Sequence, residues 1–215
     1  MNWNAPKPTS TFQLAPIGQH KAILYGLIDV GTQDTKNMKG EDVKQRQIYA
    51  QLELHGKNAP LIDGKPPVFS KRLTFSMHEK ATLRAIIEAI TNTTHSGNVY
   101  GDGIDILPAV GGACLLQLAE SKKPDGSEGR KIQAVMPVDP DAPKPERVNP
   151  LRTFNLDAFD QTIFEGLPQY MRELIAKSPE YQALNGNAIN AAQSEIAAGT
   201  PAAVTDAPFD DEIPF

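Results

Sequence analysis

Residues 45–54, with the sequence QRQIYAQLEL, carry a clear strand pattern. Every second side chain is apolar, and these form one face: Ile48, Ala50, Leu52 and Leu54. The side chains between them form a mainly polar face: Gln47, Tyr49, Gln51 and Glu53. A period of two residues is typical of a strand with one face in the core. We therefore expect a β-strand at residues 45–54.

Further strands are predicted on both sides of this segment. Upstream, residues 20–30 (HKAILYGLIDV) are apolar enough for a largely buried strand, and Gly26 in its middle indicates a bulge or bend. The polar residues 31–44 between these two strands are expected to form a long loop. Downstream, we expect strands at residues 68–75, 113–120 and 131–138, the last two joined by a hairpin loop with a Pro-Asp-Gly turn.

One helix is predicted between the third and fourth strands. Ser76 and Glu79 have the spacing of a capping box, in which each side chain satisfies a free amide at the helix start. The apolar residues that follow recur at helical spacing: Leu83, Ile86, Ile87 and Ile90. Residues 91–94 (TNTT) are expected to end the helix.

The resulting order is three strands, a helix and two strands, which is the order of the OB-fold, a five-stranded Greek-key barrel. We expect a mainly β protein with an N-terminal arm at 1–19 and the OB-fold domain at 20–152. Apolar periodicity returns at 153–184 and predicts a C-terminal helical appendage. Residues 185–208 hold few large apolar groups and are expected to be a disordered linker before a tip at 209–215.

The charge is distributed unevenly along the chain. Its net charge is -5 at neutral pH, but residues 1–152 carry +3 and residues 153–215 carry -8. A mildly basic body with an acidic tail is compatible with binding to nucleic acid. The single cysteine, Cys114, excludes a disulfide framework and favours a reducing compartment. Without an apolar stretch of membrane-spanning length or a signal peptide, a cytoplasmic protein with no membrane partner is expected.

The C-terminal sequence DAPFDDEIPF (residues 206–215) resembles the tip of bacterial single-stranded DNA-binding proteins, which place acidic residues before Ile-Pro-Phe. A partner can bury the terminal ring and clamp the carboxylate with Lys or Arg, while the acids steer the encounter. The resemblance implies docking of replication, recombination or repair proteins at seven residues: Phe209, Asp210, Asp211, Glu212, Ile213, Pro214 and Phe215.

The body resembles a divergent, phage-encoded branch of the same family. Two stretches carry this likeness: residues 69–90 (FSKRLTFSMHEKATLRAIIEAI) before Gly111 and Cys114, and Phe164 to Pro168 with Ile175, Ser178, Glu180 and Tyr181. The resemblance implies that the protein binds single-stranded DNA in the cytoplasm of a bacterial cell, which is the host cell if the protein is encoded by a phage. A homo-oligomer is compatible with it.

Binding of a single strand requires cations for phosphates and aromatic faces for bases. In an OB-fold the groove crosses strands two and three between two loops. Basic residues at these places are Lys36, Lys39, Lys44 and Arg46 near the first loop, Lys71 and Arg72 on the third strand, and Lys122, Lys123, Arg130 and Lys131 near the second loop. Tyr49 is the strongest stacking candidate because it lies on the polar face of its strand, and Phe69 is a weaker one.

The sequence thus predicts a protein that binds single-stranded DNA without sequence preference. We expect no cofactor, no metal site and no enzyme activity, because histidines, cysteine and acids lack catalytic or metal-ligand spacing. Two alternatives stay open: a recombination mediator or interaction hub that binds DNA weakly, and an RNA-binding OB protein.

Overall fold

The computed structural model describes residues 14–37, 39–97, 104–123 and 126–185. Most of the predicted arm and linker, and all of the predicted tip, lie outside these residues. The protein is mainly β. Its strands are β1 (Gly18–Lys36), β2 (Asp42–His55), β3 (Val68–Thr74), β4 (Ala113–Lys122), β5 (Glu128–Pro137) and β6 (Arg152–Phe154). Its numbered α-helices are α1 (Thr82–Thr91), α2 (Gln161–Glu165) and α3 (Gln169–Ala176), and residues 179–185 are helical as well. Two 3-10 turns are η1 (Leu107–Ala109) and η2 (Leu156–Ala158).

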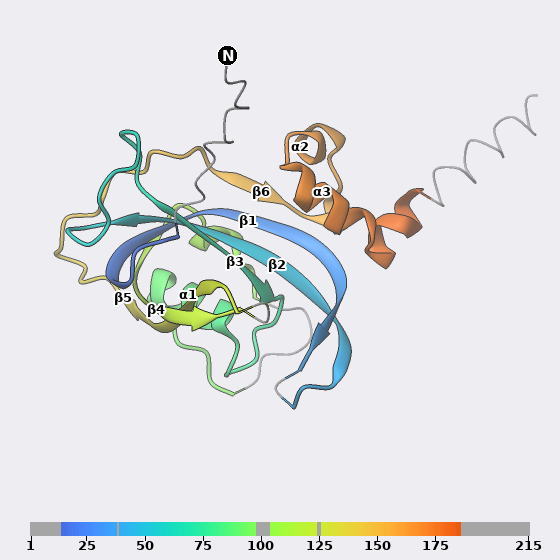
Figure 1. The fold of residues 1–215 in the computed structure, drawn as a ribbon, viewed down its shortest axis with the longest axis horizontal. Helices are drawn as coiled ribbons and strands as arrows, with labels where there is room; N and C mark the ends of the chain where they lie inside the picture. The colour runs from blue at the N-terminus through green and yellow to red at the C-terminus, as the bar shows by residue number, and fades with distance from the viewer. Residues whose placement is uncertain (1–13, 38, 98–103, 124–125, 186–215) are drawn as a thin grey trace, which may run out of the picture.

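The strands form one curved sheet in the order β3-β2-β1-β4-β5 (Figure 1). Each neighbouring pair in this order is antiparallel, and the short β6 pairs with β1 in parallel. Among the pairings of the described residues there is no ladder between β3 and β5, so the sheet is open at this seam. Each of the five strands predicted from the sequence corresponds to one of the strands β1 to β5.

The long strand β1 bends where glycines interrupt its pairing with β2. The register shifts between Leu24 and Gly26, as predicted for a bulge, and again between Asp29 and Gly31. A Cβ at Gly26 would lie 2.4 Å from the side-chain oxygen of Gln51, so the Gln51 side chain occupies space that only a glycine at position 26 leaves free. The bends let β1 pair with β2 over its length and with β4 and β6 on its other side.

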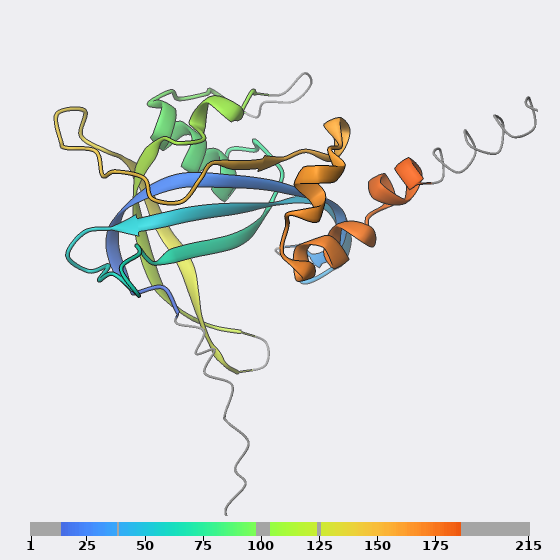
Figure 2. The ribbon, with the colours of Figure 1, turned by 90° about the horizontal axis from the view of Figure 1, so that it is seen from above.

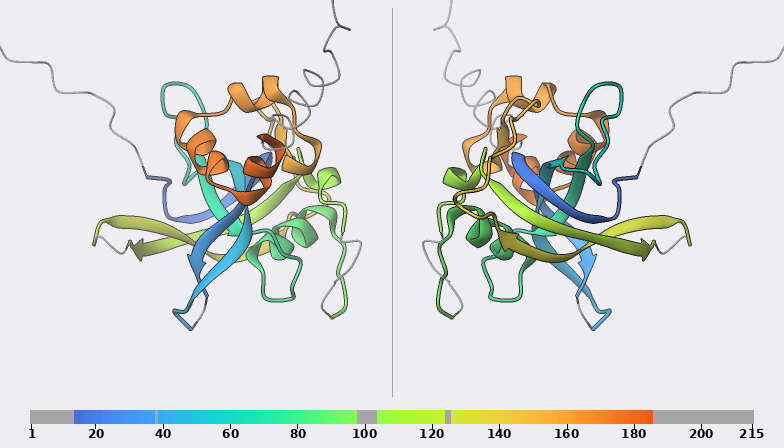
Figure 3. Two further views of the ribbon diagram at one scale, coloured as in Figure 1. Left: turned by 90° about the vertical axis from the view of Figure 1, so that its right-hand side faces the viewer. Right: turned by 90° about the vertical axis from the view of Figure 1, so that its left-hand side faces the viewer.

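The predicted long loop at 31–44 was wrong. Most of these residues extend the β1–β2 hairpin, whose register continues from Gly31 opposite Gln47 to Lys36 opposite Asp42. The turn itself is short: the amide of Asn37 donates to the backbone oxygen of Glu41, and the amide of Glu41 donates to the side-chain oxygen of Asn37. Polar residues form strands here because the outer part of the hairpin projects into solvent, with Asp34, Lys36, Asp42 and Lys44 exposed. The β1–β2 and β4–β5 hairpins project from the sheet in different directions (Figure 3).

Two apolar clusters lie on opposite faces of β1. Leu24 and Leu27 belong to the main core, which α1 covers, whereas Ile28 and Val30 belong to a second cluster beneath α2 and α3. Figure 2 shows α1 and the α2–α3 pair on different sides of the sheet. Cys114 is fully buried in the main core, and burial raises the pKa of its thiol to about 12, as suits a small apolar group.

The predicted capping box does not form. Helix α1 begins at Thr82, its N-cap residue is Ala81, and no side chain caps it. Ser76 instead accepts a hydrogen bond from the backbone of His78 at 3.1 Å, within the loop after β3. The predicted end was right: Asn92 adopts the left-handed conformation (φ 52°) directly after Thr91.

Candidate nucleic-acid interface

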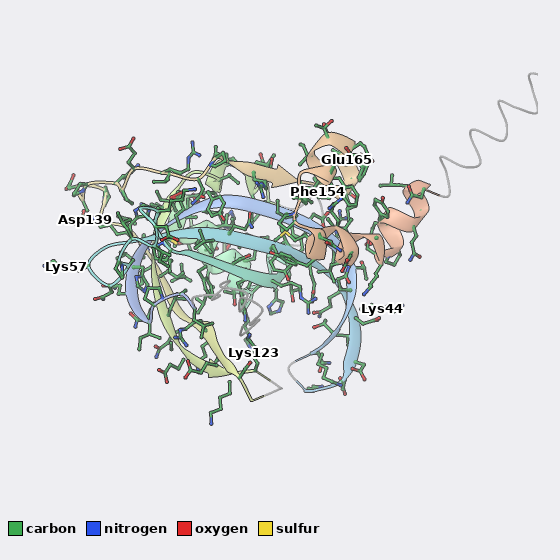
Figure 4. The ribbon with its side chains drawn as sticks, turned by 45° about the horizontal axis from the view of Figure 1, so that its top comes forward. Lys44, Lys57, Lys123, Asp139, Phe154 and Glu165 are labelled. Carbon is green, nitrogen blue, oxygen red and sulfur yellow. The ribbon has the colours of Figure 1, made fainter. Side chains whose placement is uncertain are left out.

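A basic groove runs along the open seam between β3 and the end of the β4–β5 hairpin. This seam groove has a volume of about 480 Å³, and its lining residues are Leu14, Ala15, Val68, Phe69, Ser70, Lys71, Ser121, Lys122, Lys123, Gly129 and Arg130. Four of them are cationic and none is acidic. Figure 4 shows Lys123 near the end of the β4–β5 hairpin and Lys44 on the β1–β2 hairpin. The seam groove thus brings together five of the twelve residues predicted to bind DNA.

The cations of the seam groove are available to an anionic ligand. Among the described residues, none of the four has an ion-pair partner. The Arg130 side chain donates hydrogen bonds to the backbone oxygens of Ala15 (2.8 Å) and Gly129 (2.9 Å). These bonds hold the guanidinium in the groove wall, and they are to neutral acceptors. The groove is therefore suited to phosphates.

A second groove lies between the β1–β2 hairpin and the loop that leads into α1. This hairpin groove has a volume of about 550 Å³ and is lined by Lys36, Asn37, Gln45, Arg72, Leu73, Thr74, Ser76, His78, Lys80, Ala81 and Thr82. Its charge is partly compensated, because Lys36 forms an exposed ion pair of 2.7 Å with Asp42. Lys80 is a candidate that the sequence analysis missed, since the expected capping box placed it inside the helix.

Strand β3 joins the two grooves. Residues 68–71 of the strand line the seam groove and residues 72–74 line the hairpin groove, so Lys71 and Arg72 stand where the two grooves meet. The exposed side chains of β3 run from one groove to the other: Val68, Ser70, Arg72 and Thr74. A single strand that followed this surface would meet cations at both ends.

Four of the predicted DNA-binding cations line neither groove. Lys39, Lys44 and Lys131 are exposed on the hairpins. Arg46 is committed to an internal ion pair: one of its terminal nitrogens lies 2.5 Å from the buried carboxylate of Asp29 and 2.9 Å from Asp157. The hydrogen bond to Asp29 raises the pKa of the Arg46 guanidinium above its usual range.

The two predicted stacking residues are not open aromatic faces. Phe69 lines the seam groove, but its side chain is only 6% exposed. Tyr49 is half-buried and meets the edge of Tyr170 from α3, with ring centroids 6.2 Å apart. The face of β2 that looked polar in the sequence is in fact mostly covered. Gln47 and Gln51 are buried on either side of Tyr49.

The segments that cover this face of β2 are held in place by hydrogen bonds between parts of the chain that are distant in sequence. The fully buried carboxylate of Glu53 accepts bonds from the backbone amides of Val148 (3.0 Å) and Asn149 (2.6 Å), which fixes the segment before β6 over β2. At the other end, the side chain of Gln33 donates to the backbone oxygen of Leu174 in α3 at 3.0 Å.

The C-terminal appendage is attached to β1 by residues between Phe164 and Tyr181, the stretch that resembles the phage-encoded proteins. Glu180 accepts bonds from the backbone amide (2.9 Å) and the hydroxyl (2.5 Å) of Thr32. Partial burial opposes ionisation, but these bonds prevail and lower the pKa of Glu180 below its ordinary value. Ser178 is fully buried against Gly31, and the Tyr181 ring stacks on Phe164 at 5.2 Å. The appendage is thus a fixed part of the domain surface.

Other classes of site find little support in the described ranges. There, no three His, Cys, Asp or Glu side chains converge as a metal site requires. No helix in the described part of the chain has the length and apolar character needed to cross a membrane. Comparison of the chain with models of known protein families and with characterised proteins gives no match.

Proposed function

We propose that the protein binds single-stranded DNA without sequence preference. The observation that carries this proposal is the seam groove, where Lys71, Lys122, Lys123 and Arg130 line one channel and no acid is among its lining residues. Sequence-independent binding relies mainly on phosphate contacts, and four cations in one channel supply them. A catalytic role has no comparable support among the described residues.

The topology supports an OB-type Greek-key barrel as the scaffold of this site. The sheet order, with α1 between β3 and β4, is that expected of such a barrel, which is partly open in other proteins as well. In an OB-fold the nucleic-acid surface lies at strands two and three and the adjoining hairpin loops. The two grooves described above lie at these places.

The C-terminal tip is proposed to recruit replication, recombination or repair proteins in a bacterial cell. This part of the proposal rests on the sequence of residues 209–215, which lie outside the described residues. Its separation from the groove residues by the predicted linker would let one chain hold DNA and a protein partner together.

Fluorescence anisotropy with labelled oligo-dT, a duplex of equal length and oligo-U tests the proposal. We expect oligo-dT to bind more tightly than the duplex at the same salt concentration, and the affinity to fall steeply with salt. Equal binding of duplex would contradict the proposal, and tighter binding of oligo-U would instead assign the groove to RNA.

A further inference from the structure

The two grooves supply cations. None of the described residues that line them presents an open aromatic face. Phe69 is buried in the wall of the seam groove, and Phe75, which follows β3, is only partly exposed. A single-strand binder gains much of its affinity from bases that stack on exposed rings. An exposed ring is found in α3, where Tyr170 is 53% exposed.

Tyr170 is held in a defined orientation against Tyr49 of β2. Its ring contacts that of Tyr49 at 6.2 Å, with an angle of 76° between the ring planes. Tyr49 lies directly opposite Arg72 in the β2–β3 register, and opposite residues of an antiparallel pair point to the same face. Arg72, which lines the hairpin groove, is therefore on the same face of the sheet as Tyr49, which Tyr170 contacts.

A second guanidinium, that of Arg152, lies across the sheet from Arg72: Arg152 of β6 is opposite Gly26 of β1, whereas Arg72 of β3 is opposite Tyr49 of β2. Burial raises the pKa of the Tyr25 hydroxyl to about 12 and also raises the pKa of the Tyr170 hydroxyl, and the charge of Arg152 opposes both shifts. In the described part of the chain, neither Arg72 nor Arg152 has an ion-pair or hydrogen-bond partner. An exposed ring between two unpaired guanidinium groups matches a base between two phosphates.

We propose that Tyr170 of the appendage is a stacking platform for a nucleobase of the bound strand, with Arg72 and Arg152 contacting the flanking phosphates. This inference rests on the proposed function and extends the DNA path from the hairpin groove onto α3. The appendage is fixed to β1 on both sides of α3, because the amide of Leu156 donates to Asp29 before it and the amide of Thr32 donates to Glu180 after it. Its role is then to enlarge the binding surface as well as to cover the second apolar cluster.

The test compares Tyr170→Ala with wild type on oligo-dT and on an abasic oligonucleotide of equal length. Loss of one stacked base should weaken oligo-dT binding about 5- to 150-fold, leave the salt dependence unchanged, and have no effect on the abasic strand. Tyr170→Phe should retain most of the affinity, because the ring and not the hydroxyl stacks. Ile163→Ala is the matched control, since Ile163 is a similarly exposed residue (41%) on the neighbouring α2.

A spectroscopic measurement makes the test independent of affinity. Trp3 is the only tryptophan, so a Trp3→Phe/Tyr170→Trp variant carries one reporter at the proposed platform. We expect oligo-dT to quench its fluorescence, and to leave a Trp3→Phe/Ile163→Trp variant unquenched. Absence of quenching together with unchanged oligo-dT affinity of Tyr170→Ala would overturn the inference, and so would tighter binding, which would show that α3 occludes the strand. If wild type did not bind oligo-dT at all, the proposed function itself would fail.

Discussion

Removal of two charges from the seam groove, by Lys122→Ala and Lys123→Ala together, should change the salt dependence of DNA binding by a calculable amount. Each phosphate neutralised on a single strand contributes about 0.7 to the slope of log K against log salt concentration. The four groove cations therefore account for a slope of about -2.8, and the double variant should retain about half of this part. At roughly 0.1 M monovalent salt, the lost slope of about 1.4 corresponds to binding about 25-fold weaker.

Anisotropy titrations of oligo-dT at several salt concentrations measure this slope directly. The matched control is Lys57→Ala/Lys144→Ala, which removes the same charge from two exposed lysines that line neither groove. The control should keep the wild-type slope, apart from a small change caused by the loss of two positive charges from the whole protein. A double variant at Lys122 and Lys123 with an unchanged slope would refute the assignment of the seam groove, and equal loss in both variants would show that only overall charge matters.

Three further predictions concern the appendage and the tip. Gly31→Ala should lower the free energy of unfolding by about 2–5 kcal/mol in urea titrations, because φ is +70° and the new Cβ would lie 2.5 Å from Cβ of Ser178; wild-type stability would show that the appendage yields there. Acidification should destabilise the Glu180→Gln variant less than wild type. Folding lowers the pKa of Glu180, so its carboxylate stabilises the folded state above the pKa of the unfolded chain, and this stability is lost as pH falls through the pKa of the folded state. Identical pH profiles of the urea midpoints would exclude this contribution. Phe215→Ala should abolish capture of partner proteins from a bacterial lysate while oligo-dT affinity stays the same, and retention of the same partners would make the tip a solubilising tail.

Local patterns were sufficient to predict the strands. The alternation at 45–54 and the apolar run at 20–30 correspond to β2 and β1, because a period of two residues depends only on neighbours in sequence. The covering of the polar face of β2 could not be predicted in this way. Glu53 is buried by the amide of Val148, which lies 95 residues further along the chain. Tyr49 looked exposed for the same reason, since Tyr170 is even more distant.

The candidate site was predicted in part. Lys71, Lys122 and Lys123 come together because strand order decides which loops flank β3, and strand order was readable. Arg46 is different: its partner Asp29 lies within the apolar stretch AILYGLIDV, and a buried carboxylate requires a cation nearby. This acid in an apolar run was the available signal for an internal ion pair.

The buried carboxylate of Asp29 also determines how the molecule comes apart. Its oxygens accept hydrogen bonds from the amide of Gly31 in β1 and from Arg46 in β2, and the amide of Leu156 donates to it from the start of the appendage at 3.3 Å. Detachment of the appendage would therefore expose apolar surface and leave this charge with fewer donors. The sheet and the appendage should consequently unfold as one cooperative unit, in which amide hydrogens of α3 exchange with solvent nearly as slowly as those of β1.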